Sequence, residues 1–149
     1  MNPNSSVPDE RSAIEALLKR WEQAACASDL DAVMACYTDD LVAYDAVLQL
    51  QFRGAAAYRA HWQRCMEMCP GGTLFEMAEP AIVADGGTLA FAHYLLRCGG
   101  PDEHGELKTS WLRGTVGLRR GADGWRIAHE HISVPFDMQS GKALFDLTP

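Results

Sequence analysis

The 149-residue sequence has no long hydrophobic run and no excess of positive charge, and each absence excludes a class of protein. No apolar stretch approaches the roughly 20 residues that a membrane-spanning helix needs. Thirteen Lys and Arg residues stand against 20 Asp and Glu residues, which gives a formal net charge of −7. That charge repels phosphate backbones and anionic membrane surfaces. We therefore expect neither nucleic acid nor a membrane as a partner.

Several sequence motifs are also absent. The chain has no glycine-rich phosphate loop, no dinucleotide-binding fingerprint and no nucleophile elbow, so we expect it to work without a cofactor. Its first residues lack a charged-then-apolar signal segment, so the expected location is the cytoplasm. The five cysteines are an odd number without framework spacing, which indicates reduced thiols inside a cell.

What is present is an ordinary globular composition, 48% hydrophobic and 22% charged. The length predicts a single domain over residues 1–149, long enough to bury about two thirds of the surface of the unfolded chain. Residues 1–9 contain two prolines and polar residues, and we expect them to form a loose tail.

Hydrophobic periodicity predicts helices in the first half of the chain and strands in the second. The expected helices cover about 10–25, 30–37 and 55–69, the last of them entered from Phe52-Arg53-Gly54. The expected strands cover about 41–47, 73–84, 88–98, 107–120 and 125–133. Gly99–Gly105 is expected to be a polar loop. Helices followed by a run of strands indicate an α+β fold, in which a curved antiparallel β-sheet wraps over three helices and forms a cone.

The segment Asp123–Asp137, DGWRIAHEHISVPFD, carries the densest group of polar side chains on a predicted strand. Strict alternation predicts that Trp125, Ile127, His129, His131 and Ser133 share one face. That face begins apolar and becomes polar, which is typical of the wall of a small-molecule pocket. We therefore expect the protein to bind a small hydrophobic molecule.

The chain resembles the NTF2-like superfamily, in particular its SnoaL-like and ketosteroid-isomerase-like bacterial members. The resemblance covers roughly residues 10–137 and lies in four places. These are Ser28-Asp29-Leu30-Asp31-Ala32-Val33, Tyr37-Thr38-Asp39-Asp40, Phe52-Arg53-Gly54 and the final run from Gly124-Trp125-Arg126-Ile127 to His129, His131 and Ser133. It implies a cone-shaped sheet packed on three N-terminal helices, and it leaves the reaction open because this fold hosts many functions.

The resemblance also implies a role for Asp45. The segment from Asp39 to Asp45 looks like the isomerase segment that ends in the catalytic general base. Two positions depart from the isomerase pattern: Trp21 stands where the oxyanion-binding tyrosine is expected, and the strand 107–119 lacks the second carboxyl group. These departures count against steroid isomerase activity and leave room for a base with a different electrophile. Asp45 could instead be paired with Arg113 or Arg53, or lie in water near a pocket mouth.

Other side chains are candidates for the same site. His129 and His131 could transfer protons, and Arg113 could bind a carboxylate or an enolate oxygen. His93, His129 and His131 together could alternatively hold a metal ion, although we expect none. His61 and His104 are expected to face solvent. The expected ligand-binding residues are Trp21, Tyr37, Trp62, His93, Trp111, Thr115 and Ser133.

The sequence supports two main hypotheses about function. The first is a cofactor-independent isomerase, cyclase or dehydratase-like enzyme, which acts on a hydrophobic carbonyl compound and uses Asp45 as general base. The second is a noncatalytic module that binds a small molecule. Under either hypothesis we expect a homodimer that forms through the outer face of the sheet.

Overall fold

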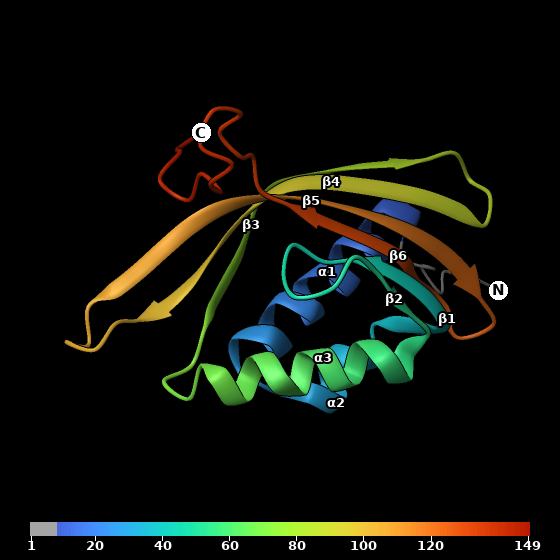
Figure 1. The fold of residues 1–149 in the computed structure, drawn as a ribbon. Coiled ribbons are helices and arrows are strands. Elements are labelled where there is room, and N and C mark those ends of the chain that lie inside the picture. Colours follow the sequence, from blue (N-terminus) through green and yellow to red (C-terminus); the bar gives the residue numbers. More distant parts are fainter. Residues whose placement is uncertain (1–8) are drawn as a thin grey trace, which may run out of the picture.

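The computed structural model describes residues 9–149, which form one curved sheet with helices on its concave side (Figure 1). Almost all of the expected N-terminal tail lies outside the described residues. The elements follow the order α1 (Glu10–Cys26), α2 (Leu30–Met34), β1 (Tyr37–Tyr44), β2 (Phe52–Arg53), α3 (Ala55–Met68), β3 (Leu74–Ala84), β4 (Leu89–Pro101), β5 (Leu107–Gly121) and β6 (Gly124–Ser133). The predicted α+β class and the three helices are confirmed.

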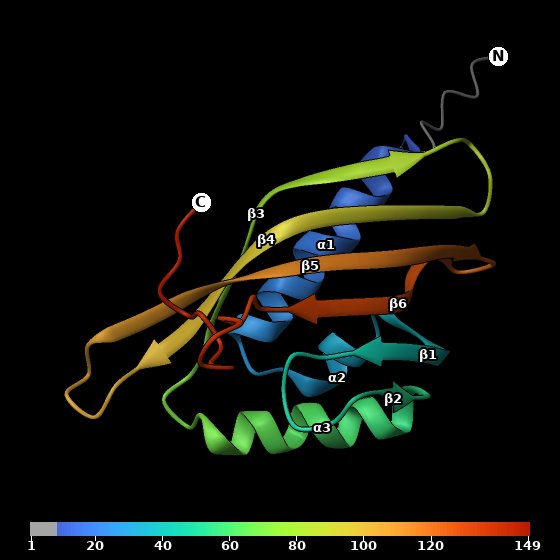
Figure 2. The same cartoon turned by 45° about the horizontal axis from the view of Figure 1, so that its top comes forward.

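The six strands form a single sheet in the order β2-β1-β6-β5-β4-β3, which can be followed from bottom to top in Figure 2. All neighbouring pairs are antiparallel except β1 and β6, which run parallel. The long β4–β5 hairpin curls away from the rest of the sheet at its Pro101–Leu107 end (Figure 1). This curvature gives the sheet an inner face, which faces the helices, and an outer face.

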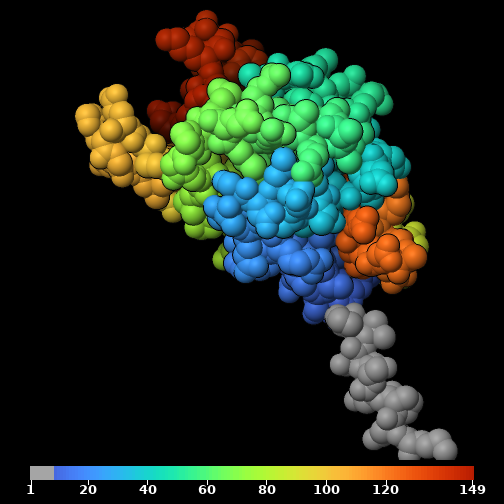
Figure 3. Space-filling model, turned by 90° about the horizontal axis from the view of Figure 1, so that it is seen from below, coloured from blue at the N-terminus to red at the C-terminus, as the bar shows by residue number. Residues whose placement is uncertain are grey.

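Helix α1 forms because its apolar side chains recur every three or four residues, so that they fall on one stripe. Ile14, Leu17, Leu18 and Trp21 are all buried against the sheet. A short link leads to α2, where the carboxylate of Asp29 accepts the Ala32 backbone N–H at 3.1 Å and caps the new helix. Figure 3, seen from the helical side, shows α1, α2 and α3 covering this face of the molecule.

Three boundaries differ from the sequence prediction. Tyr37 and residues 38–40 were expected to finish the second helix, but they open β1, because Tyr37 pairs with Ile127 of β6. Phe52–Arg53, expected only to lead into the third helix, forms the short strand β2 before α3 begins at Ala55. Residues Gly99–Pro101 extend β4 through pairing with residues 107–109, so the expected polar loop is shorter. In each case pairing with a distant strand outweighs the local pattern.

The alternation of β6 is broken by a β-bulge. Leu118 of β5 pairs with Ile127, and the preceding Gly117 pairs with His129, so Ala128 is an extra residue on β6. Trp125 and Ile127 face inward before the bulge, whereas Glu130 and Ile132 are the buried residues after it. The prediction that His129, His131 and Ser133 share the face of Trp125 and Ile127 is therefore wrong, because one inserted residue reverses the side-chain faces.

Gly114 of β5 leaves space for a buried ring. A Cβ atom at this position would lie 2.7 Å from Cζ of Tyr94. Tyr94 is 5% exposed and has little room to move. We expect Gly114→Ala to lower the free energy of unfolding by about 1–3 kcal/mol, as overpacking of a core usually does.

The matched control for Gly114→Ala is Gly117→Ala on the same strand. There the added Cβ would meet only the His129 Cβ at 3.4 Å, which is ordinary contact. Urea unfolding of both variants checks the prediction. Equal stability of the two variants would mean that Tyr94 can repack.

No helix within residues 9–149 has both the length and the apolar character that a membrane crossing would require.

Candidate functional site

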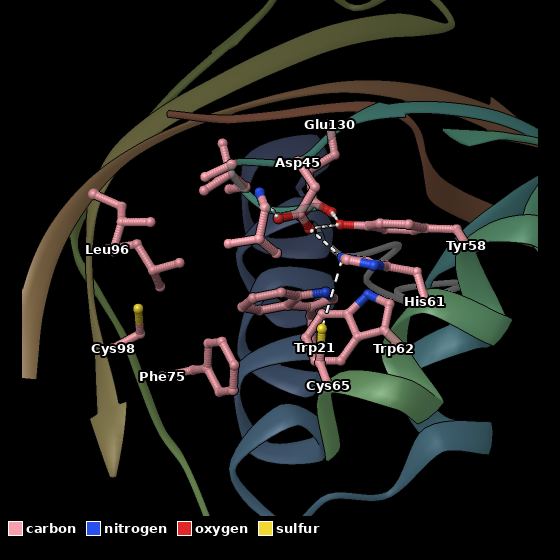
Figure 4. Close-up of a pocket in the computed structure, with 14 residues that line it drawn as sticks. Trp21, Asp45, Tyr58, His61, Trp62, Cys65, Phe75, Leu96, Cys98 and Glu130 are labelled. Atoms are coloured by element: carbon pink, nitrogen blue, oxygen red, sulfur yellow. Dashed lines mark hydrogen bonds and ion pairs between the residues drawn. The ribbon is translucent and has the colours of Figure 1, made fainter. Parts of the chain in front are cut away.

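A cavity of about 180 Å³ lies between the inner face of the sheet and helices α1 and α3 (Figure 4). Its lining is mostly apolar and aromatic, with a small group of polar side chains at one side. The lining residues are Trp21, Asp45, Ala46, Val47, Tyr58, His61, Trp62, Cys65, Phe75, Leu96, Cys98, Leu112, Glu130 and Ile132. An apolar chamber with a few convergent polar groups is the usual form of a small-molecule site.

Asp45 follows the last residue of β1 and lies at the edge of the cavity, where its side chain is 18% exposed. Its Oδ2 atom accepts a hydrogen bond from the Tyr58 hydroxyl at 2.9 Å and lies 3.3 Å from Nε2 of His61. Its Oδ1 atom accepts the Val47 backbone N–H at 3.3 Å. Among residues 9–149, Asp45 forms no ion pair with an arginine or a lysine. The alternative pairing with Arg113 or Arg53 is therefore not observed.

Helix α3 supplies the two partners of Asp45. Tyr58 and His61 are three residues apart on one face of this helix, and their rings stack at 5.7 Å between centroids. Phe52 packs against both rings, with its centroid 4.2 Å from that of His61 and 5.5 Å from that of Tyr58. His61 is only 6% exposed, so the expectation that it faces solvent is wrong. Its burial follows from the short strand β2, which places Phe52 over the ring.

Glu130 is a second buried carboxyl group, and it is 1% exposed. Its Oε2 atom lies 2.7 Å from the hydroxyl oxygen of Tyr58 and accepts a hydrogen bond from the Tyr37 hydroxyl at 2.8 Å. Its Oε1 atom is buried without a hydrogen-bond partner. The pKa of Glu130 is raised to about 7, chiefly by burial and to a smaller extent by the charge of Asp45, while the hydrogen bonds with Tyr58 and Tyr37 oppose the rise.

The tyrosines of this network remain neutral donors. Burial holds the pKa values of Tyr37 and Tyr58 well above 10, and the neighbouring Glu130 charge raises both further. The indole of Trp21 donates to the Tyr37 hydroxyl at 2.7 Å, which directs the Tyr37 proton towards Glu130. A continuous chain therefore runs from Trp21 through Tyr37, Glu130 and Tyr58 to Asp45.

Cys65 lies beside this network but is not set up as a nucleophile. Its Sγ atom is 3.8 Å from Nε2 of His61, the same nitrogen that faces Asp45. A Cys-His-Asp triad needs two different ring nitrogens, one for each partner. Burial also raises the pKa of the Cys65 thiol, which disfavours the reactive thiolate.

A shallow groove of about 570 Å³ adjoins the cavity and connects the site to the surface. Asp45, Ala46 and Ile132 line both spaces, so the Asp45 carboxyl lies at the boundary between them. Residues Gln49–Gln51, His131 and Ser133 also line the groove. A ligand that enters along the groove would pass Asp45 first.

The fold and the cavity agree with a family match. Residues 14–137 match the model of the SnoaL-like domain family. The chain is a SnoaL-like protein of the NTF2-like superfamily.

Solved structures of other NTF2-like proteins support this assignment. An NTF2-like protein of unknown function from Pseudomonas putida KT2440 is 49% identical, with a TM-score of 0.84 over 93% of this chain and 95% of that chain. A ketosteroid isomerase-like protein from Erwinia carotovora atroseptica is 24% identical, with a TM-score of 0.68 over 84% and 95% of the two chains.

A suggested dehydratase of the NTF2-like family from Streptomyces avermitilis is 15% identical, with a TM-score of 0.71 over 83% and 95% of the two chains. The last two similarities show the fold alone. No curated protein matches the sequence.

Three of the predicted site residues line the cavity of this SnoaL-like protein: Asp45, Trp21 and Trp62. Tyr37 lies behind the cavity wall, where it contacts Glu130. The remaining predicted residues lie on the outer face of the sheet, on the strands β4, β5 and β6. They are His93, Trp111, Arg113, Thr115, His129, His131 and Ser133.

The outer-face position of these residues has a physical cause. Leu112, Gly114 and Val116 point inward, so Trp111, Arg113 and Thr115 between them must point outward. For β6, the bulge at Ala128 moves both histidines to the outer face. There His129 and His131 contact the Tyr44 ring, and Nδ1 of His129 lies 2.7 Å from the Val42 carbonyl oxygen. The prediction that Arg113, His129 and His131 gather with Asp45 around one pocket is wrong for this cavity. Only His131 and Ser133 share a space with Asp45, the shallow groove.

The alternative three-histidine metal site does not form. His93 on β4 and His131 on β6 pair with opposite sides of Thr115, so strand β5 separates them. Within the described part of the chain, no three His, Cys, Asp or Glu side chains lie close enough together to hold a metal ion.

Three polar residues of the cavity were not predicted from the sequence as part of the site: Tyr58, His61 and Glu130. Tyr58 and His61 had a detectable signal, because they share the apolar stripe of α3 with Trp62. Glu130 had none, because strict alternation places it on the face opposite Trp125 and Ile127. Its position depends on the bulge, which the local sequence does not encode.

Proposed function

We propose that this SnoaL-like protein is a cofactor-independent acid–base enzyme that removes a proton next to the carbonyl group of a small hydrophobic compound. Isomerisation and dehydration both begin with this step. The observation that supports the proposal is the Asp45 carboxylate at the edge of an apolar cavity, with Tyr58 and His61 fixed against it. A general base must lie within hydrogen-bond reach of the substrate proton, and Asp45 can do so from the cavity wall.

The size of the cavity sets the size of the substrate. An apolar cavity of about 150 Å³ can hold benzene, whereas drug-sized ligands occupy roughly 300–1,000 Å³. The value of about 180 Å³ therefore favours a compound with one ring and short substituents. A four-ring steroid would not fit within this cavity alone, which agrees with the departures from the isomerase pattern.

Asp45 and the residues around it would have different roles in the reaction. Asp45 takes the proton, and the pair of electrons from the broken C–H bond moves into the enolate. The imidazole of His61, 3.3 Å from Asp45, is placed to donate to the developing oxyanion or to the carboxylate. Trp21, Trp62 and Phe75 form an aromatic wall with ring centroids 5.6–5.8 Å apart, which excludes water.

An experiment that does not require the natural substrate tests this proposal. The purified protein is incubated in D2O with cyclohexanone or acetophenone, and deuterium at the carbon next to the carbonyl is followed by NMR. We expect exchange faster than in buffer alone. Exchange at the buffer rate for both ketones, together with tight binding of either, would favour the noncatalytic binding module.

We further propose that the protein is a homodimer that uses the outer face of the sheet. No helix of residues 9–149 covers this face, which exposes the large apolar side chains of Tyr44, Val83, Phe91 and Leu95. A second copy related by a two-fold axis would cover the same residues on both chains.

In size-exclusion chromatography with light-scattering detection, we expect the wild-type protein to be a dimer and the Leu95→Glu variant to be a monomer. A buried glutamate without a partner would cost more than the contact can supply. The control is Leu50→Glu, because Leu50 is 92% exposed in the loop between β1 and β2. A dimer that survives Leu95→Glu would place the interface elsewhere.

A further inference from the structure

The hydroxyl of Tyr58 lies between two carboxyl groups. Its oxygen is 2.9 Å from Oδ2 of Asp45 and 2.7 Å from Oε2 of Glu130 (Figure 4). A neutral phenol carries one proton and can donate it to only one of these oxygens. Two ionised carboxylates would therefore leave one pair of oxygens facing each other with no hydrogen between them.

Other donors do not resolve this shortage of protons. Tyr37 also donates to Oε2 of Glu130, and its own oxygen accepts from the Trp21 indole, so its proton is already committed. Within the described residues, no lysine or arginine forms an ion pair with Asp45 or Glu130. The one cationic candidate is His61, which faces Asp45.

The titratable groups that face Glu130 come from four places. Tyr37 begins β1, Tyr58 lies on α3, Tyr94 lies on β4 and Asp45 follows β1. The Cys36 thiol before β1 also feels the charge of Glu130. None of these groups supplies a positive charge, so an ionised Glu130 would be a buried anion without a cation.

We propose that Asp45 and Glu130 hold a single proton between them in the resting protein, and that Glu130 keeps it so that Tyr58 donates to an ionised Asp45. In this arrangement Glu130 donates to the oxygen of Tyr58, and Tyr58 donates to Oδ2 of Asp45. The contact between Glu130 and Tyr58 and the contact between Tyr58 and Asp45 then each contain one hydrogen atom.

Solvation decides which carboxyl keeps the proton. Asp45 has an 18% exposed side chain, the Val47 backbone N–H and the neighbouring His61, all of which stabilise its anion. Glu130 is 1% exposed, and its Oε1 atom has no partner. An unpartnered oxygen costs less on a neutral acid than on a carboxylate. The proton therefore rests on Glu130.

Glu130 is in this view a positioning residue, which acts on substrate through Tyr58 and Asp45. This role rests on the proposed function only where it concerns catalysis, because the shared proton exists with or without a substrate. The proton removed from the substrate would go to Asp45 and return from Asp45 to the product, while the proton on Glu130 stays in place.

Carbon-13 NMR of protein labelled at the glutamate side-chain carboxyl tests the shared proton without any ligand. The sequence has nine glutamates, and Glu130→Gln identifies the signal of interest. We expect one glutamate to remain protonated at pH 6 and to lose its proton only near neutrality. A spectrum in which every glutamate is ionised by pH 6 would overturn the proposal.

The variant Asp45→Asn tests the coupling, because it removes the second carboxyl and leaves Glu130 intact. We expect the titration midpoint of Glu130 to fall by at least about a few tenths of a pH unit, because the charge of Asp45 raises the pKa of Glu130. An unchanged midpoint would mean that the two groups titrate independently, and would also overturn the proposal. This variant is near-isosteric at a partly exposed position, so the test remains open if Glu130→Gln fails to fold.

The same measurements separate this proposal from the proposed function. If the shared proton is observed but the ketones take up no deuterium, the proposal for Asp45 and Glu130 holds and the proposed enzymatic function is wrong. Exchange without a protonated glutamate at pH 6 would leave Asp45 as the base and remove the role of Glu130.

Discussion

Asp45→Asn should lower the rate of deuterium exchange into a bound ketone by about 10²–10⁴-fold, the usual contribution of a general base. Asparagine can still accept the Tyr58 hydrogen bond and fill the same space at the cavity edge. It cannot take a proton from carbon. We therefore expect ketone binding and the melting temperature to stay close to those of the wild-type protein while exchange is lost.

The control for this prediction is His131→Asn. His131 also carries an acid–base side chain and lines the groove, but it does not line the cavity. We expect exchange in this variant to match the wild-type rate. If His131→Asn is as slow as Asp45→Asn, the reaction takes place in the groove. If Asp45→Asn does not fold, Asp45 is a structural residue.

The second large effect concerns stability against pH. Glu130 has a pKa of about 7 in the folded protein, above its value of 4.5 in an unfolded chain. The folded state therefore binds the proton more tightly. The stabilisation is complete below pH 4.5 and is lost as the pH rises through about 7. With about 1.4 kcal/mol for each pKa unit, the loss amounts to about 3 kcal/mol.

Urea unfolding at pH 5 and at pH 8 measures this difference. We expect the wild-type protein to lose about 3 kcal/mol more than Glu130→Gln between these two values. The comparison matters because other groups also titrate: the pKa values of the exposed Asp40 and Asp137 are lowered by hydrogen bonds, and this contribution is common to both proteins. Equal pH slopes would show that Glu130 is ionised in the folded state at pH 5.

The folded protein also needs its tyrosines neutral. Burial raises the pKa values of Tyr37, Tyr58 and Tyr94 well above 10. Each of these tyrosines therefore lowers the stability of the folded protein once the pH exceeds the ordinary tyrosine pKa. Stability falls with rising pH, as it does for Glu130, but in a separate alkaline range. The two effects can be separated because the Glu130 range ends near neutrality.

Much of the fold follows directly from the pattern of residues. The spacing of Ile14, Leu17, Leu18 and Trp21 determined the buried face of α1, and all four are buried in the structure. Alternation along 107–120 likewise separates Leu112 and Val116 from Arg113 and Thr115. The prediction placed Arg113 and Thr115 in the pocket, whereas Leu112 and Val116 face the helices. Those signals are local, because the side chain itself prefers to leave water.

The site divides in the same way. Residues of the helices and of β1 could be located from the sequence, and Asp45, Trp21 and Trp62 do line the cavity. The face of β6 could not. Pairing with β5 on one side and β1 on the other inserts Ala128, which turns Glu130 into the cavity and His129 and His131 away from it. The residue pattern is sufficient to predict the α+β architecture and the place of Asp45 at the end of the first strand. The partners of Asp45 depend on long-range strand pairing, because a strand's register depends on its neighbours and one extra residue exchanges its two faces.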